Sequence, residues 1–198
     1  MLAQVVKEPI KVGDEAAYEA IEQETARACA ELNCPHPHLA LEPVSGPREV
    51  WWLNLFSSED DRRRVVDDYA RNAQLMAVLV RNSQRKAAVT GPVVDLLSTY
   101  RPDLSRGAHL ELAGARFIVV TINPGVVTSG GAVFEAGDGT RLLLCSARTR
   151  QDAERVASEG GATTTVLAIR PSWGVPAKDW IEADPEFWAV NPIAESRR

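Results

Sequence analysis

The chain has few cysteines and no long apolar segment. Only three cysteines, Cys29, Cys34 and Cys145, occur among its 198 residues, so the sequence offers no disulfide framework and fits a reduced compartment. Nowhere do 18 apolar residues run together, and Met1–Glu8 lacks the charge and apolar pattern of a signal peptide. We therefore expect a cytoplasmic protein with no membrane partner.

The chain also lacks an excess of basic residues. Lysine and arginine number 22 against 27 aspartates and glutamates, which gives a net charge of −5. Nucleic-acid binding calls for a basic stripe, so we expect no nucleic-acid partner. The one basic run, Arg62–Arg64, lies between acidic residues and is typical of a solvated helix face.

Common motifs for nucleotide, zinc-peptidase and serine-hydrolase chemistry are absent as well. Cys34, His36 and His38 do place a thiol and two imidazoles within five residues, a set that could in principle hold zinc or copper. Structural zinc sites usually combine two such pairs of ligands, and no second pair is evident. We predict no metal site, and we interpret the segment as a turn between helix and strand.

What the sequence does contain is an internal repeat with an offset of 91 residues. Residues 50–56 and 141–147 both read as strands that follow a turn. Each leads into a helix start of the form Ser/Thr-x-x-Asp, with Ser58 and Asp61 in the first copy and Thr149 and Asp152 in the second. Such a repeat predicts two related lobes.

The first lobe, residues 1–103, reads strand, helix, two strands, helix, strand, the order of a ferredoxin-like unit. The strands are predicted at 2–6, 39–44, 50–56 and 93–100, and the helices at 14–32 and 58–88. Three- and four-residue spacing predicts the buried helix faces. These faces comprise Tyr18, Ile21, Thr25, Ala28 and Leu32 in the first helix, and Val65, Tyr69, Ala73, Met76 and Val80 in the second.

The second lobe, residues 104–171, repeats this order in shortened form. Strands are predicted at 117–122, 132–135, 141–145 and 163–169, with one helix at 150–158. Residues 123–131 are too short and too rich in proline and glycine for a helix, so we expect this lobe to lack its first helix. The tail, 172–198, carries Trp173, Trp180, Phe187 and Trp188, and we expect it to pack on the body.

The element order, the tryptophan-bearing third strand and its passage through Ser58 and acidic residues into a helix resemble the dimeric α+β-barrel superfamily. That superfamily includes antibiotic-biosynthesis-monooxygenase-like and NIPSNAP-like proteins. The resemblance covers roughly residues 1–171 and implies an α+β fold, with two ferredoxin-like lobes, each an antiparallel sheet with helices on one face, forming a pseudo-dimeric barrel within one chain. No catalytic residues can be carried over from it, and the protein could be a monomer or a homodimer.

The two faces of strand 50–56 suggest where a ligand could bind. Trp51, Leu53 and Leu55 form an apolar face suited to packing under helices, whereas the opposite face includes the amide of Asn54, which is costly to bury without a partner. Under the offset, Asn54 corresponds to Cys145. We predict that both point into one cavity between the lobes, although a bonded core amide and an inert buried thiol remain the plainer interpretation. The candidate cavity residues are Trp52, Asn54, Phe56, Tyr69, Cys145 and His38.

Two functions remain open from the sequence. The first is a small-molecule enzyme, oxygenase-like by resemblance, that acts on an apolar or aromatic metabolite in the cavity. The second is a non-catalytic ligand-binding or protein-interaction scaffold. Some members of the resembled superfamily act as oxygenases without a metal and others bind haem, so the cofactor, if one is needed, is unassigned.

Overall fold

The computed structural model describes residues 1–106, 110–125, 130–160 and 163–196. The strands are β1 (Leu2–Pro9), β2 (His38–Pro43), β3 (Glu49–Phe56), β4 (Val94–Tyr100), β5 (Phe117–Ile122), β6 (Ala132–Ala136), β7 (Arg141–Ala147) and β8 (Thr164–Ile169). The helices are α1 (Glu15–Glu31), α2 (Glu59–Arg71), α3 (Ala73–Val89), α4 (Arg150–Gly160), α5 (Lys178–Ala183), α6 (Pro185–Trp188) and α7 (Pro192–Ser196). Within the described residues, none of these helices has the length and apolarity needed to cross a bilayer.

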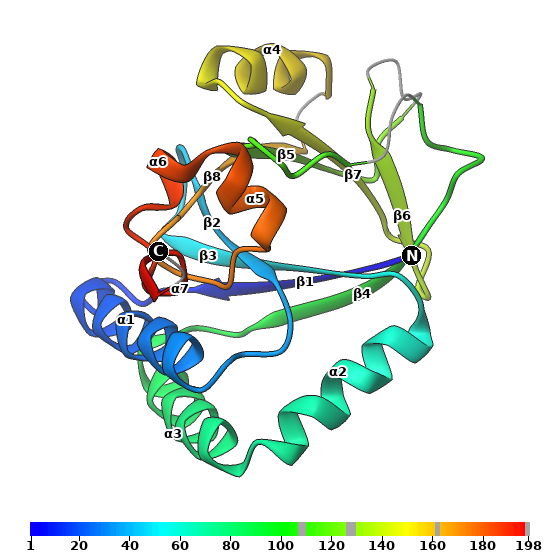
Figure 1. The fold of residues 1–198 in the computed structure, drawn as a ribbon. Helices are drawn as coiled ribbons and strands as arrows, with labels where there is room; N and C mark the ends of the chain where they lie inside the picture. The colour runs from blue at the N-terminus through cyan, green and yellow to red at the C-terminus, as the bar shows by residue number, and fades with distance from the viewer. Residues whose placement is uncertain (107–109, 126–129, 161–162, 197–198) are drawn as a thin grey trace.

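The eight strands close into one antiparallel barrel in the order β1-β3-β2-β8-β5-β7-β6-β4. Strands β1–β4 with α1–α3 form lobe 1, and strands β5–β8 with α4 form lobe 2. Each lobe has the strand order of a ferredoxin-like unit, and the lobes join where β2 pairs with β8 and β4 pairs with β6. The predicted α+β barrel of two such units in one chain is confirmed. Figure 1 shows α1–α3 on one side of the barrel and α4 on the other.

The repeat is confirmed at the level of single hydrogen bonds. Ser58 Oγ accepts a hydrogen bond from the backbone N–H of Asp61 at 3.1 Å, and Thr149 Oγ1 accepts one from that of Asp152, also at 3.1 Å. Both residues therefore cap the helix that follows the third strand of their lobe. Between β5 and β6 no helix occurs in the described residues 123–125 and 130–131, which agrees with the expected loss of a helix.

The barrel interior is filled by apolar side chains from both lobes. Trp51 and Leu53 of β3 meet Leu142 and Leu144 of β7 there, all nearly inaccessible to solvent. The prediction that the face with Trp51, Leu53 and Leu55 packs under helices is therefore wrong. In a closed barrel the enclosed side is the drier one, so it takes the purely apolar face, and the face with Asn54 lies toward the helices.

The predicted long helix 58–88 is broken at Asn72. The Asn72 side chain accepts a hydrogen bond from Leu75 N at 3.1 Å and donates one to Leu32 O at 2.8 Å, so it caps α3 and ties the break to the end of α1. The break shifts the helical phase. Leu75 and Asn82 are the buried residues of α3, whereas Val80 is exposed, so the predicted stripe is wrong beyond Tyr69.

The tail contributes to the barrel core. Trp188 of α6 is 2% exposed and belongs to the same apolar cluster as the inward-facing residues of the strands, with Trp180 and Phe187 packed beside it. Arg116 anchors this segment through a two-pronged ion pair with Asp184, the closer contact being 2.8 Å. Figure 1 shows α7 beside α1, and α5 and α6 nearer to β8.

Candidate functional site

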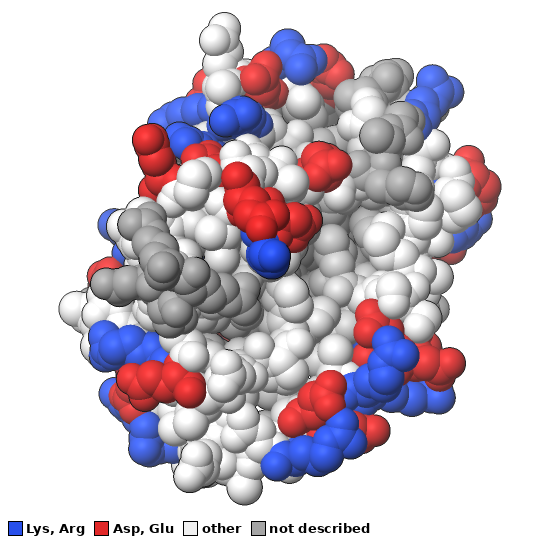
Figure 2. All heavy atoms as spheres, viewed as in Figure 1, with Lys and Arg blue, Asp and Glu red and all other residues white. Residues whose placement is uncertain are grey.

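A cleft of about 250 Å³ lies in lobe 1 between the outer face of the sheet and the three helices. We name it the lobe-1 cleft. It is lined from β1, β2 and β3 on one side and from α1, α2 and α3 on the other, by Val6, Glu8, Glu22, Thr25, His38, Trp52, Asn54, Tyr69 and Lys86. Figure 2 shows acidic and basic side chains intermixed over the visible face of the molecule, with a largely uncharged surface between them. No single sign of charge therefore dominates that face.

A buried ion cluster forms one wall of the lobe-1 cleft. Lys86 Nζ lies 3.0 and 3.1 Å from the two carboxylate oxygens of Glu8, and 3.0 Å from Glu22 Oε1. Glu8 also accepts hydrogen bonds from the Tyr18 hydroxyl and, at 3.0 Å, from Trp52 Nε1. Glu8 is thereby fully engaged, and the cluster joins β1 to α1 and α3.

Glu22 is the least satisfied member of the cluster. It is 1% exposed, and its Oε1 has no well-directed hydrogen bond, so the contact with Lys86 is an ion pair without hydrogen-bond geometry. Burial raises the pKa of Glu22 above the usual carboxyl range, and the nearby Lys86 ammonium only partly opposes that rise. A carboxyl group with a raised pKa in a cleft is suited to proton transfer.

Lys86 keeps its charge despite being largely buried. Burial alone would lower its pKa, but the carboxylates of Glu22 and Glu8 raise it above the usual value. The ammonium also lies 5.3 Å from the centre of the Trp52 ring, within the range of a cation–π contact. The lobe-1 cleft therefore contains a fixed positive charge beside an aromatic wall.

His38 contributes a neutral imidazole. Burial lowers the pKa of His38 to about 4, so the ring is uncharged at neutral pH. Its Nδ1 lies 3.1 Å from the backbone oxygen of His36. A carbonyl oxygen can only accept, so Nδ1 carries the proton and Nε2 keeps its lone pair as an acceptor.

The structure brings four of the six predicted cavity residues together and separates the other two. Trp52, Asn54, Tyr69 and His38 all line the lobe-1 cleft. Phe56 instead stacks on His36, with ring centres 4.5 Å apart.

Cys145 lies in lobe 2, in a cluster with Ala153 of α4, and its thiol donates a hydrogen bond to Gly130 O at 3.0 Å. The prediction that Asn54 and Cys145 share one cavity is therefore wrong. Each lies between the sheet and the helices of its own lobe. The repeat thus relates the two positions but does not bring them together.

The segment Cys34–His38 does not act as one cluster, because its side chains diverge. The Cys34 sulfur contacts the Tyr69 hydroxyl at 2.9 Å, His36 stacks on Phe56, and His38 lies in the cleft. Residues 34–37 form a bend rather than a strand, so the two-residue period that would place these side chains on one face does not apply.

Sequence reasoning missed the charged half of the cleft, namely Glu8, Glu22 and Lys86. For Glu22 a signal existed, because it lies four residues after Tyr18 on the buried face of α1. A carboxyl group on an otherwise apolar helix face is unusual enough to mark a site. Lys86 gave no such signal, because the phase of α3 is set by the break at Asn72.

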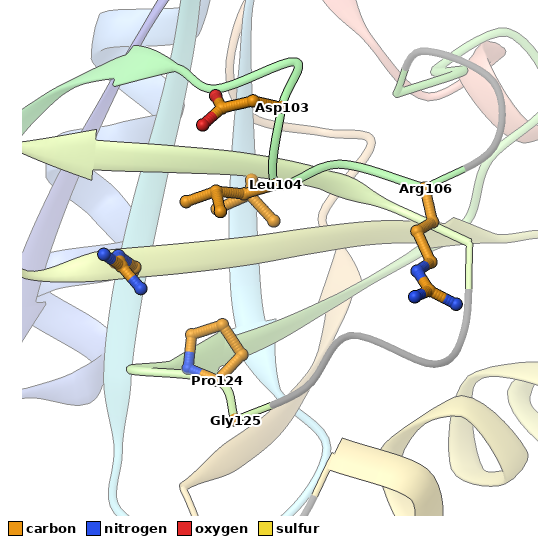
Figure 3. A pocket seen from close by; sticks show the side chains of 7 residues that line it. Asp103, Leu104, Arg106, Pro124 and Gly125 are labelled. Atoms are coloured by element: carbon orange, nitrogen blue, oxygen red, sulfur yellow. The ribbon is translucent and has the colours of Figure 1, made fainter.

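A second depression, of about 240 Å³, lies on lobe 2 and is the weaker candidate. It is lined by Asp103, Leu104, Arg106, Pro124, Gly125, Val133 and Arg141, and in Figure 3 Asp103 and Pro124 lie on opposite sides of Leu104. Its charged side chains are exposed, and Arg141 is paired with Glu135 at 2.6 Å. Its lining also adjoins residues 107–109 and 126–129, which lie outside the described residues.

Comparison with known proteins supports the fold. No protein-family model and no curated protein matches the chain. A candidate monooxygenase from Fusobacterium nucleatum matches with a TM-score of 0.51 at 8% identity, over 85% of this chain and 91% of that chain. A NIPSNAP domain protein from Burkholderia xenovorans has a TM-score of 0.39 at 15% identity, over 49% of this chain and 91% of that chain. At such identities the match to the Fusobacterium protein shows a common fold and nothing more.

Proposed function

Starting from a chain with the fold of the dimeric α+β-barrel superfamily, we propose that it is a small-molecule enzyme whose site is the lobe-1 cleft. An aromatic or apolar metabolite packs against Trp52, and a polar group of that metabolite exchanges a proton with Glu22. The observation that carries this proposal is the Glu22 carboxyl itself, 1% exposed, without a directed hydrogen bond at Oε1 and on the wall of a cleft.

The other lining groups have complementary roles in this proposal. His38 Nε2 accepts a hydrogen bond from a substrate hydroxyl and orients it, because a ring with a pKa of about 4 is a weak base at neutral pH. Lys86 stabilises the negative charge that develops on the substrate after deprotonation. Asn54 and Tyr69 offer further polar contacts in the lobe-1 cleft.

Deprotonation of this kind fits the oxygenase-like chemistry that the resemblance implies. An aromatic substrate that loses a proton becomes electron-rich, which is what an oxygenase without a metal requires of its substrate. The candidate monooxygenase with the same fold points in the same direction. An isomerase would begin with the same proton transfer. The proposal therefore specifies the step that the two reactions share, which is proton abstraction from a small apolar substrate.

Haem, which some members of the superfamily bind, does not fit the described residues. A cleft of about 250 Å³ lies below the usual range of ligand pockets, about 300–1,000 Å³, and suits a single ring rather than a tetrapyrrole. The barrel interior is closed to it by side chains from both lobes and by Trp188.

A thermal-shift screen tests the proposal. Small phenols, aromatic acids, flavins and haem are added to the full chain, and a ligand that binds the native state raises the melting temperature. We expect a single-ring aromatic compound to give a shift that is lost in Trp52→Ala and weakened in Glu22→Gln. Cys145→Ser, in the other lobe, is the control and should retain it. A shift that survives both cleft variants, or no shift across the panel, contradicts the proposal.

The scaffold remains a second candidate, favoured by one observation. The barrel interior, where a superfamily ligand would be sought, is filled by side chains, including Trp188 from the tail. If no compound in the thermal-shift screen raises the melting temperature, a non-catalytic interaction module is therefore favoured.

A further inference from the structure

Two cysteines meet at the end of α1 because of the way this helix terminates. The backbone N–H of Cys34 donates to the carbonyl of Cys29 at 2.9 Å, and Asn33 between them has a φ of 55°. This is a Schellman termination, in which the third residue from the end of the helix and the third residue after that end come into side-chain contact. Here those two residues are Cys29 and Cys34, which pack in one cluster and are both free thiols.

The two thiols differ in their surroundings. Cys29 is 4% exposed, whereas Cys34 is only partly buried and contacts the Tyr69 hydroxyl at 2.9 Å. Interaction with the neighbouring Cys29 thiol, together with the contact to the Tyr69 hydroxyl, lowers the pKa of Cys34, whereas the Cys34 sulfur and burial raise the pKa of Cys29. The more exposed sulfur is thus the one more readily present as the reactive thiolate, and the buried one remains a thiol beside it.

We propose that Cys29 and Cys34 form a reversible disulfide when the protein meets a hydroperoxide, and that Tyr69 reports this change to the lobe-1 cleft. The Cys34 thiolate attacks the peroxide, the O–O bond breaks, and with one proton the products are a sulfenic acid on Cys34 and an alcohol or water. The Cys29 sulfur then attacks the Cys34 sulfur, and the S–S bond forms as water leaves. Two electrons pass from the two thiols to the peroxide.

Oxidation changes the wall of the lobe-1 cleft. Tyr69 lines the cleft, and its hydroxyl is engaged by the Cys34 sulfur in the reduced protein. A disulfide sulfur is a far weaker acceptor than a thiolate, so the hydroxyl becomes available to the cleft. This effect on the cleft rests on the proposed function, whereas disulfide formation does not.

Peptide mapping tests the disulfide without any knowledge of the ligand. The full chain is treated with hydrogen peroxide, unfolded, alkylated and cut with trypsin, which cleaves after Arg27 and Arg48 and so places both cysteines in one peptide. We expect the mass of this peptide to fall by two hydrogens and its cysteines to resist alkylation. Dithiothreitol should reduce the disulfide and restore both the original mass and the alkylation. Cys145, hydrogen-bonded to Gly130 in the other lobe, should remain alkylatable and serves as the internal control.

Three variants test the individual steps of disulfide formation. Cys29→Ser should stop at a sulfenic acid that dimedone traps, and Cys145→Ser should behave as the parent does. Tyr69→Phe removes one hydrogen bond to the Cys34 sulfur. The thiolate becomes scarcer but more nucleophilic, so oxidation should slow about threefold.

Further oxidation of Cys34 to a sulfinic acid with no disulfide, or equal loss of the Cys145 thiol, would overturn the disulfide. An unchanged rate in Tyr69→Phe would overturn the link to the cleft.

Discussion

Lys86 Nζ lies 3.0 Å from Glu22 Oε1, an ion pair between two helices that both pack on the lobe-1 sheet. The Glu22 side chain is 1% exposed and that of Lys86 is 19% exposed, so neither charge is well solvated. Because Glu8 faces the same ammonium, two carboxyl groups share one cation. The stability of the cluster and its response to pH therefore both depend on this pairing of two carboxyl groups with one ammonium.

Lys86→Met should destabilise the protein by about 3–5 kcal/mol, because it leaves two carboxyl groups buried without a cation. Equilibrium unfolding in urea measures the change. Lys178→Met is the matched control, since the Lys178 side chain is 82% exposed and its pairing with Glu182 is that of a surface helix pair. The control should stay within about 0.5 kcal/mol of the parent. Equal effects of the two substitutions would contradict a buried cluster.

Glu22→Gln should flatten the dependence of stability on pH. The pKa of Glu22 is raised in the folded protein, so above the usual carboxyl range the folded state holds a proton that the unfolded state releases. The free energy of unfolding therefore falls as pH rises through the window between the unfolded and folded pKa values. Gln removes this slope, and urea titrations across pH 4–8 measure it. Glu24→Gln, also on α1, should leave this falling slope unchanged, because Arg85 and Arg81 lower the pKa of Glu24, so its own contribution has the opposite sign and lies below the usual carboxyl pKa.

His38 should titrate with a midpoint near pH 4 in NMR spectra of the folded chain. Its pKa is lowered by burial, so between about pH 4 and 6.5 the unfolded state binds a proton that the folded state does not. The contribution to stability is complete above pH 6.5 and is lost as pH falls toward 4. Because the ring is partly exposed, the loss should be about 2 kcal/mol, and His38→Asn should abolish it. A midpoint near 6.5 would show that the imidazole is solvated.

Local patterns in the sequence were sufficient to predict the architecture. Ser58 and Thr149 cap equivalent helices as the offset of 91 residues indicated, since capping depends only on residues within one turn. The assignment of strand faces failed for a different reason. Alternation separates Trp51 from Trp52, but both faces of a barrel strand with helices outside it are covered, so polarity alone could not tell the barrel interior from the helix side.

The site was only half predictable for similar reasons. Trp52 and Asn54 were accessible to reasoning because they share a face of one strand. The partners Glu8 and Lys86 lie 78 residues apart, and their meeting depends on the break at Asn72, where a side-chain cap resets the helix. Asparagine is a favoured N-cap, so Asn72 could have been recognised as the start of a new helix. The apparently continuous apolar spacing across it led instead to the prediction of one long helix.

The two lobes should respond alike to loss of their helix caps. Ser58→Ala and Thr149→Ala each remove a side-chain acceptor for a first-turn N–H, at a cost of about 1 kcal/mol. The caps lie in different lobes and share no partner, so the double variant should lose about 2 kcal/mol, within about 0.5 kcal/mol of additivity. Thermal or urea unfolding of the three variants provides the measurement. Strong non-additivity would indicate that α2 and α4 are coupled through the barrel.

Trp188→Ala should destabilise the barrel itself and not only the tail. Trp188 is 2% exposed within the main apolar cluster, and its ring lies 5.3 Å from that of Phe187 and 6.3 Å from that of Trp180. Loss of such a ring opens a cavity in the core and should cost about 3–5 kcal/mol. Val190→Ala, two residues on and 63% exposed, is the control and should change the unfolding free energy by less than about 0.5 kcal/mol. If the tail were only an external cover, Trp188→Ala would unfold at nearly the same urea concentration as the control. A large loss would show that the apolar core of the barrel includes the tail of this chain.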